Sequence, residues 1–225
     1  LSEVRSFAES FQARFDRLDV LVSNAGVLLQ ERTRTVDGVE LTFATNVLGP
    51  FLLTRLLLPA LRRSPSSRVI TVSSGGMYTA RLDPDDPQLD RREFDGPAFY
   101  AHSKRAEVVL NRLWSERHAD AGIGFHAMHP GWADTAGVRS SLPRFRRLMR
   151  PLLRDSAQGA DTIVWLATAP VLEPRSGGFW HDRKPRPEHR VPWTRETAPE
   201  RERLWAECER LTAPFERESV PGPTA

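Results

Sequence analysis

The sequence has a single cysteine, Cys208, among its 225 residues. One thiol can form neither an internal disulfide nor a cage of thiolate ligands around a metal. This fits a reducing compartment, and we expect the protein in the cytoplasm. His126 and His129 flank the end of a predicted strand, but no third ligand follows at metal spacing, so we expect no metal site.

Long hydrophobic runs are also lacking. The best one, from Phe51 to Leu61, is shorter than the roughly 18 apolar residues of a membrane helix and contains Arg55. No secretory signal pattern is present, so the sequence predicts no membrane segment. The chain starts at Leu1 inside a predicted helix, and we expect the natural N-terminus to lie further upstream.

Lysine is scarce, since only Lys104 and Lys184 are lysines among the 32 basic residues. The arginines lie along the whole chain beside 29 acidic residues, and the net charge is only +3. This arrangement gives no basic stripe of the kind that binds nucleic acid, so we expect no nucleic-acid partner. The hydrophobic fraction of 40% and the chain length suit one soluble domain with a large core.

Apolar strand-like runs alternate with helical patterns along the chain, and Pro50 predicts either a kink or two abutting helices in the second helical stretch. The predicted helices are 3–15, 39–61, 98–119 and 156–168, the last with Ser156 near its N-cap. The predicted buried strands are 18–22, 68–74, 124–128 and 176–182. Strands separated by helices indicate βα units and an α/β fold with a Rossmann-like, doubly wound parallel sheet.

The sequence predicts that the chain is divided into two parts. Residues 1–190 form the predicted sheet domain, and residues 191–225 form a proline-rich tail with one helix near 199–212 and a frayed end. Residues 80–97 are polar and rich in proline, which predicts a surface loop. The segment from Pro143 to Arg154 is rich in arginine. It is either a solvated helical face, which we favour, or a cover over an acidic substrate.

Polar side chains gather where three of the predicted strands end. They are Ser23-Asn24, Ser73-Ser74 and His129-Pro130-Gly131. The carboxyl ends of parallel strands meet at one edge of a sheet, where ligands bind in such folds. Each cluster could be ordinary turn chemistry, but three together favour a site at this edge.

Tyr100 and Lys104 lie four residues apart on the predicted helix 98–119, so their side chains share one face. A positive charge beside a buried phenol favours the phenolate, which would make Tyr100 an acid or base for an alcohol/ketone pair. The pair alone is a weak signal, because Lys104 could equally lie in water on an ordinary helix face.

Two further residues can support such chemistry. Ser74 precedes Gly75 and Gly76, where its hydroxyl could bind a substrate oxygen and the glycines would let a ligand approach the backbone. The alternative is a serine that merely ends a strand. Asn46 lies in a helix among apolar neighbours and needs a polar partner if it is buried.

These residues occur in five motifs that resemble those of the short-chain dehydrogenase/reductase family, in the family's order. SNAG at 23–26 resembles the family's NNAG motif, and the stretch 45–61 resembles the helix that carries its active-site asparagine. RVITVSS at 68–74 matches the strand with the catalytic serine, and YAHSK at 100–104 matches the tyrosine/lysine motif. HPGWADT at 129–135 resembles the segment that packs on nicotinamide. The resemblance extends from residue 1 to about 185, and the long insert before Tyr100 is shared with the retinol-dehydrogenase-like branch.

The resemblance implies an oxidoreductase that transfers a hydride between NADP or NAD, NADP being slightly favoured, and a small carbonyl or alcohol substrate. It implies that Tyr100 moves the hydroxyl proton, that Lys104 lowers the Tyr100 pKa and holds the nicotinamide ribose, and that Ser74 steadies the substrate oxygen. Asn46 would support a water molecule beside Lys104. The implied cofactor contacts are Asn24, Ala25, Gly26, Tyr100, Lys104, Pro130, Gly131 and Thr135. A homodimer through the helices 39–61 and 98–119 is also implied.

The sequence departs from the family in two places. Ser23 replaces the first asparagine of NNAG, and no Gly-rich turn of the kind that holds a pyrophosphate at a helix N-terminus occurs in the chain. The expected sheet therefore lacks the family's first βαβ unit. Two alternatives to the enzyme stay open: a non-catalytic cofactor-binding protein of the same fold, and an inactive fragment.

Overall fold

The computed structural model describes residues 1–132 and 153–216 of the chain, and its centre is a five-stranded sheet in the order β1-β2-β3-β4-β5. The first four strands are parallel, with Val20 opposite Arg68 and His126 opposite Gly178. β5 pairs antiparallel with β4. The strands are β1 (Val20–Ser23), β2 (Ser67–Val72), β3 (Ile123–Met128), β4 (Gly178–His181) and β5 (Lys184–Pro185).

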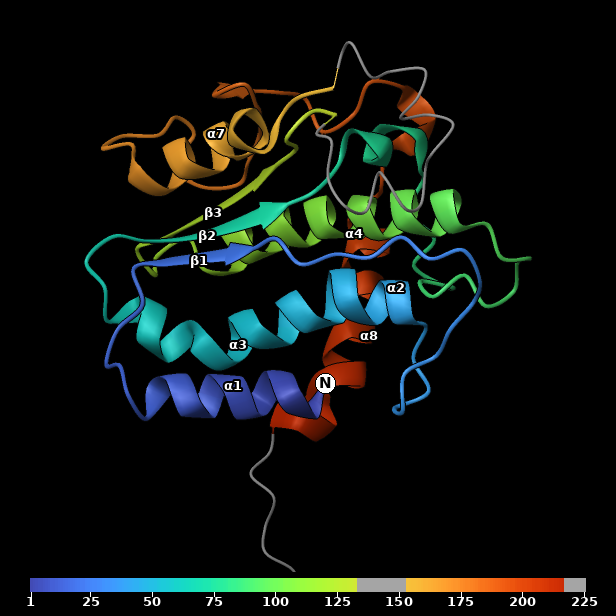
Figure 1. The fold of residues 1–225 in the computed structure, drawn as a ribbon, viewed down its shortest axis with the longest axis horizontal. Coiled ribbons are helices and arrows are strands. Elements are labelled where there is room, and N and C mark those ends of the chain that lie inside the picture. Colours follow the sequence, from blue (N-terminus) through green and yellow to red (C-terminus); the bar gives the residue numbers. More distant parts are fainter. Residues whose placement is uncertain (133–152, 217–225) are drawn as a thin grey trace, which may run out of the picture.

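Helices cover both faces of this sheet, which confirms the predicted doubly wound α/β fold (Figure 1). Side chains alternate between the faces, because successive residues of a strand point in opposite directions. Val69 and Phe125 pack with the residues of α3 and α4, whereas Ile70 and Met128 pack with those of α7. The helices are α1 (Ser2–Gln12), α2 (Leu41–Phe43), α3 (Gly49–Arg62), α4 (Gly96–Arg117), α7 (Ser156–Thr168) and α8 (Ala198–Glu216).

The long helical stretch around Pro50 is continuous but irregular. Between α2 and α3 lies a π-helical turn, η1 (Ala44–Leu48). Pro50 has no N–H with which to bond the carbonyl of residue 46 in α-helical geometry, so the wider turn falls where that bond would be lost. The stretch Leu41–Arg62 is long and apolar enough to cross a membrane, but 56% of its most apolar window is buried inside the protein.

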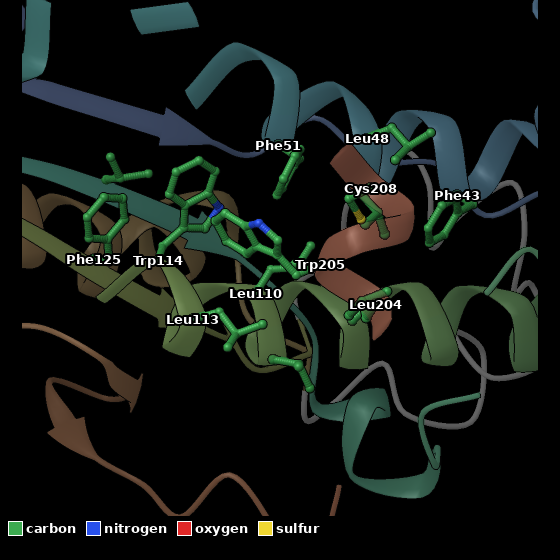
Figure 2. Packing of buried hydrophobic residues seen from close by; sticks show 14 of the residues in the cluster. Phe43, Leu48, Phe51, Leu110, Leu113, Trp114, Phe125, Leu204, Trp205 and Cys208 are labelled. Carbon is green, nitrogen blue, oxygen red and sulfur yellow. The ribbon is translucent and has the colours of Figure 1, made fainter. Parts of the chain in front are cut away.

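Three aromatic side chains join α3, α4 and α8 in the largest cluster of buried apolar residues (Figure 2). The ring centroids of Phe51 and Trp114 are 5.2 Å apart, those of Phe51 and Trp205 are 5.0 Å apart, and those of Trp114 and Trp205 are 4.7 Å apart. Leu204 and Cys208 of α8 are also fully buried. The C-terminal helix α8 is therefore part of this core. It begins at Ala198, one residue before the predicted start at Pro199. Residues 217–225 lie outside the described part.

Two details refine the sequence predictions. The N-cap of α7 is Asp155, which forms a capping box with Gln158, so the cap lies one residue before Ser156. The segment 80–97 is not wholly a surface loop, because Leu82 and Leu89 are each only 3% exposed. Asp86 holds the segment together, since its carboxylate accepts hydrogen bonds from the N–H groups of the residues at 90 and 91.

The first strand is less buried than predicted. β1 is the edge of the sheet within the described residues, and Val22 is 40% exposed. Phe7 of α1 and Phe15 just beyond that helix are also exposed. The prediction of a buried strand assumed a parallel neighbour on each side, and the described part of the chain supplies one only on the β2 side.

Candidate active site

Helix α4 carries the tyrosine/lysine pair to the carboxyl ends of β2 and β3. Asp95 caps the helix by accepting a hydrogen bond from the Ala98 N–H at 3.1 Å, and this fixes where the helix begins. Tyr100, Lys104 and Glu107 then follow at positions i, i+4 and i+7, so all three lie on one face. The Lys104 and Glu107 side chains are only 3% and 5% exposed.

Lys104 lies inside the protein, not in water. Its Nζ donates hydrogen bonds to the Val72 carbonyl oxygen at 3.0 Å and to Glu107 Oε1 at 2.7 Å. The same nitrogen lies 5.5 Å from the centroid of the Tyr100 ring. The structure therefore brings the two residues of the pair together at the end of β2, with a carboxyl group directly behind the lysine.

The electrostatics of Tyr100 are more balanced than the sequence predicts. Burial raises the pKa of the phenol, Lys104 lowers it, Glu107 raises it again, and the hydrogen bond with Ser74 lowers it. The net result is a raised pKa, because the loss of solvation outweighs the positive charge of Lys104. The expectation that Lys104 lowers the Tyr100 pKa thus describes one contribution correctly but not the sum.

Ser74 lies between the end of β2 and the short 3₁₀ helix η2 (Gly75–Thr79), whose N-cap it forms. Its Oγ accepts a hydrogen bond from the Gly76 N–H at 3.2 Å, which leaves the hydroxyl hydrogen for another oxygen. A side chain at Gly75 would lie 3.7 Å from His129 Nδ1, so the backbone there passes close to the end of β3. Ser74 therefore combines the turn function and the site placement that the sequence left as alternatives.

Asn46 is fully buried in η1 and fastens the loop after β1 to α4. Its Oδ1 accepts from the Val27 N–H at 2.8 Å, and its Nδ2 donates to the Val27 carbonyl at 3.1 Å and to Ser103 Oγ at 2.8 Å. The Ser103 hydroxyl in turn donates to the Tyr100 carbonyl. The Asn46 side chain thus makes hydrogen bonds to Val27 and Ser103, and its support of a water molecule stays a prediction.

Asn24, Ala25 and Gly26 follow β1 and are exposed at the same edge of the sheet. Gly26 is the member that lies closest to the pair. A Cβ atom added there would be 3.3 Å from both Asn46 Oδ1 and Lys104 Nζ. A side chain at this position would therefore crowd the lysine.

Pro130 and Gly131 form the turn after β3, and an arginine outside the predicted set holds them. Arg154 donates to the Pro130 carbonyl at 3.3 Å and forms a bidentate ion pair with Asp182, at 2.6 and 2.9 Å. Gly131 has a φ of +77°, and an added Cβ would approach Arg154 Nε to 2.8 Å. Thr135 and the arginines from 144 to 150 lie outside the described residues.

Sequence reasoning missed Glu107 and Arg154 at this site. Glu107 could have been found from its spacing, because it continues the Tyr100 and Lys104 face by one more turn in a stretch whose neighbours are apolar. Arg154 carried no such signal, since it was one of many arginines in a segment without periodicity. Its partner Asp182 lies 28 residues further along the chain.

Comparison with known proteins agrees with this fold. The family profile described as short chain dehydrogenase matches residues 1–82. Dehydrogenase/reductase SDR family member 12 from Homo sapiens is 44% identical over 216 residues, which cover 95% of this chain and 67% of that protein. The form from Bos taurus is 49% identical over 187 residues, with 83% of this chain and 58% of that protein covered. Human retinol dehydrogenase 12 is 38% identical over 183 residues, which cover 80% of this chain and 58% of that protein.

Solved structures show the same architecture. An uncharacterised protein from Mycobacterium paratuberculosis superposes with a TM-score of 0.72 at 28% identity, over 94% of this chain and 72% of the other. An NADPH-bound carbonyl reductase from chicken fatty liver superposes with a TM-score of 0.57 at 25% identity, over 78% and 68% of the two chains. The chain spans 58 to 67% of the length of the relatives named above. On this evidence, the chain belongs to the short-chain dehydrogenase/reductase family.

Proposed function

We propose that this chain carries the proton-transfer half of an NAD(P)-dependent oxidoreductase that interconverts a small carbonyl compound and its alcohol. The observation that supports this best is the grouping of the Tyr100 phenol, the Ser74 hydroxyl and the Lys104 ammonium at the carboxyl edge of the sheet. One donor or acceptor of a proton, one hydroxyl for the substrate oxygen and one buried positive charge are the groups that such a reaction needs.

The residues at this edge fit the nicotinamide end of a dinucleotide. Gly26 leaves free space beside Lys104 Nζ that a Cβ atom would fill, and Arg154 holds the Pro130-Gly131 turn from behind. We assign the cofactor contacts to Asn24, Ala25, Gly26, Tyr100, Lys104, Pro130 and Gly131, together with Thr135 of the undescribed segment. When bound, the cofactor would supply or accept the hydride. NADP is slightly favoured over NAD, in line with the NADPH-bound structural neighbour.

In the proposed reduction, Tyr100 donates its phenolic proton to the substrate oxygen, and in the oxidation it accepts the proton of the alcohol. Ser74 donates a hydrogen bond to the same oxygen and so orients the carbon toward the cofactor. Lys104 offsets the negative charge that develops on the phenolate. Asn46 acts indirectly, because its hydrogen bonds to Val27 and Ser103 hold the loop after β1 against α4.

The test is turnover of NADPH or NADH by the complete gene product with a panel of aldehydes and ketones. Tyr100→Phe should abolish turnover and leave cofactor binding largely intact, because only the proton donor is removed. Tyr78→Phe is the matched control, since the Tyr78 hydroxyl donates a hydrogen bond to the Pro187 carbonyl and is not part of the Tyr100, Ser74 and Lys104 set. Full activity of Tyr100→Phe would contradict the mechanism. Tight binding of NADPH with no turnover across the panel would instead support a non-catalytic cofactor-binding protein.

We propose that a homodimer uses a surface other than residues 101–111 of α4. Residues 101–111 of this helix are all buried within the chain, and α8 packs against both α3 and α4. A partner could reach α4 only if α8 moved away. Light scattering of the complete protein tests whether it forms a homodimer.

We also propose a cytoplasmic location. It rests on the single, buried cysteine and on the packing of the apolar stretch Leu41–Arg62 into the core of the domain. Fractionation of cells that express the complete gene product tests this. Recovery of the protein with membranes after a high-salt wash would contradict it.

A further inference from the structure

The carboxyl group of Glu107 is buried beside Lys104, and the proposed reaction assigns no role to it. Its Oε1 accepts the hydrogen bond from Lys104 Nζ at 2.7 Å. Its Oε2 is buried and accepts no hydrogen bond of ordinary geometry among the described residues, while the Ser73 hydroxyl is near enough to the carboxyl group to lower its pKa. A buried carboxyl oxygen without a partner costs free energy, so a group of this kind calls for a functional or a solvent-based explanation.

A small cavity with both polar and apolar lining adjoins Glu107 between α3, α4 and the sheet. It has a volume of about 20 Å³, which is enough for one water molecule. Its polar lining residues are Asn46, Thr54, Thr71, Glu107 and Asn111. A water molecule there would have the two to four polar partners that buried water needs, with Glu107 as the charged one.

The groups around Glu107 come from every element packed against it. On α4 these are Tyr100, Lys104 and Asn111, and from β2 and the residue after it they are Thr71, the Val72 carbonyl and the Ser73 hydroxyl. The π-helical turn and α3 contribute Asn46 and Thr54, and β3 contributes only Phe125. Within the described residues, Lys104 is therefore the one charged side chain that faces the Glu107 carboxyl.

This arrangement couples three titratable groups in series. Building on the proposed function, we propose that Glu107 is a positioning residue that acts through Lys104: its carboxylate holds the ammonium against β2 and cancels its charge, whereas its acid form releases that charge to act on Tyr100. The geometry that supports this is the single face shared by the three side chains and the short Lys104–Glu107 contact.

The electrostatics agree with this geometry in sign. Burial raises the pKa of Glu107 to about 7, even though Lys104 lowers it. The negative charge of Glu107 raises the pKa of Tyr100, opposite to the effect of Lys104. As the pH rises through about 7, Glu107 therefore loses its proton, and Tyr100 becomes a weaker acid and, once ionised, a stronger base.

The chain contains only two tyrosines, Tyr78 and Tyr100, and this permits a direct test without turnover. With ¹³C at the ζ carbon of tyrosine, NMR should show two signals, and Tyr78→Phe assigns them. We expect the Tyr100 signal of the wild-type protein to show a small step near pH 7 in addition to its own high-pH titration. In Glu107→Gln the step should vanish, and the ionisation constant of Tyr100 should increase by on the order of tenfold.

Glu116→Gln is the matched control, because it makes the same chemical change on the same helix at a side chain that is 48% exposed. It should leave both the step and the Tyr100 ionisation unchanged. A wild-type Tyr100 signal that passes smoothly through pH 7 would overturn the proposal, and this measurement needs no variant that must fold. A Glu107→Gln protein that folds and keeps the step would overturn it as well.

A second readout separates this proposal from the proposed function. If the complete protein oxidises an alcohol, the rising limb of its rate against pH should move to lower pH in Glu107→Gln, and a purely structural role would lower stability without moving that limb. An unchanged limb in an active enzyme contradicts the role of Glu107 alone. Absence of turnover in the wild type contradicts the proposed function and leaves the NMR test decisive for Glu107.

Discussion

Arg105 and Glu196 form an ion pair inside the protein, with side chains that are 0% and 4% exposed. The Glu196 carboxylate accepts from Arg105 Nε and, at 2.8 Å, from the second terminal nitrogen of the guanidinium. Arg105 also donates to the Glu188 carbonyl at 2.6 Å. The residue that follows Lys104 therefore ties the segment before α8 to α4.

Removing one partner of this pair should destabilise the protein strongly. Glu196→Gln leaves the Arg105 charge buried without its counter-charge, which typically costs about 3–5 kcal/mol. Glu202→Gln is the control, because its pair with Arg117 is largely exposed and should be worth less than about 1 kcal/mol. Urea unfolding of the three proteins measures both differences, and equal midpoints for the two variants would contradict the assignment.

The aromatic group of α3, α4 and α8 gives a second stability prediction. Trp205→Ala removes a side chain that is 4% exposed and contacts Phe51 and Trp114, and we expect a loss of about 3–5 kcal/mol. Trp193→Ala serves as the control, because Trp193 is 69% exposed and its loss should change stability by at most about 0.5 kcal/mol. Thermal unfolding followed by circular dichroism distinguishes the two. A small effect at Trp205 would show that α8 is only loosely docked.

The turn at Gly131 gives a prediction about the site. Gly131→Ala must place a Cβ atom at a positive φ and 2.8 Å from Arg154 Nε, so the Arg154 contact with the turn should be displaced. Gly122→Ala is a matched control with a φ of +70° and no heavy atom within 4 Å of the added Cβ. Both carry the backbone strain of roughly 1–2 kcal/mol. Only Gly131→Ala should lose about 1 kcal/mol of further stability through the steric clash, which urea unfolding measures. Only this variant should also bind NADPH more weakly, which calorimetric titration measures.

Acid should weaken the fold through His102. Burial lowers the pKa of this imidazole to about 4, and its Nε2 accepts a hydrogen bond from the Asp83 N–H at 3.1 Å. Because the unfolded state binds the proton near pH 6.5, stability is fully present above that pH and is lost as the pH falls toward 4. The loss between pH 7 and pH 5 should be about 2 kcal/mol for this residue.

The measurement is the free energy of unfolding in urea at several pH values. His102→Gln, whose amide oxygen can also accept the Asp83 N–H, should reduce the slope between pH 6.5 and 5. Part of the slope should remain, because burial also lowers the pKa values of His126 and His129 to about 4. A slope identical to that of the wild type would contradict the role of His102.

The strand and helix order was predictable from the sequence because it depends on local periodicity. The runs at 68–74 and 124–128 alternate or concentrate apolar residues, and the structure places β2 and β3 there within two residues at each end. The partial exposure of Val22 was not predictable in this way, because burial of a strand depends on neighbours that its own residues do not encode. The same holds for Leu82 and Leu89, whose burial depends on the folded contacts of the insert.

The candidate site was predictable in its reactive groups but not in their environment. The spacing of Tyr100 and Lys104 indicated a shared helix face, and the strand-end position of Ser74 indicated the same edge of the sheet. The enclosure of Lys104 with Glu107 depends on how α3 and β2 close over α4, which no periodicity reports. For that reason the sequence correctly predicted that Lys104 lowers the pKa of Tyr100, but it did not predict that burial raises the net pKa.

The burial of residues 101–111 of α4 has a consequence for the motions of the site. The sheet, η1, η2, α8 and the segment tied to Arg105 all cover residues 101–111. Amide hydrogens in such a helix exchange with solvent only when a large part of the fold opens together. Tyr100 and Lys104 lie at the start of this buried stretch, so we expect fluctuations of the loop after β1 or of the Gly131 turn to leave the distance between the two side chains unchanged.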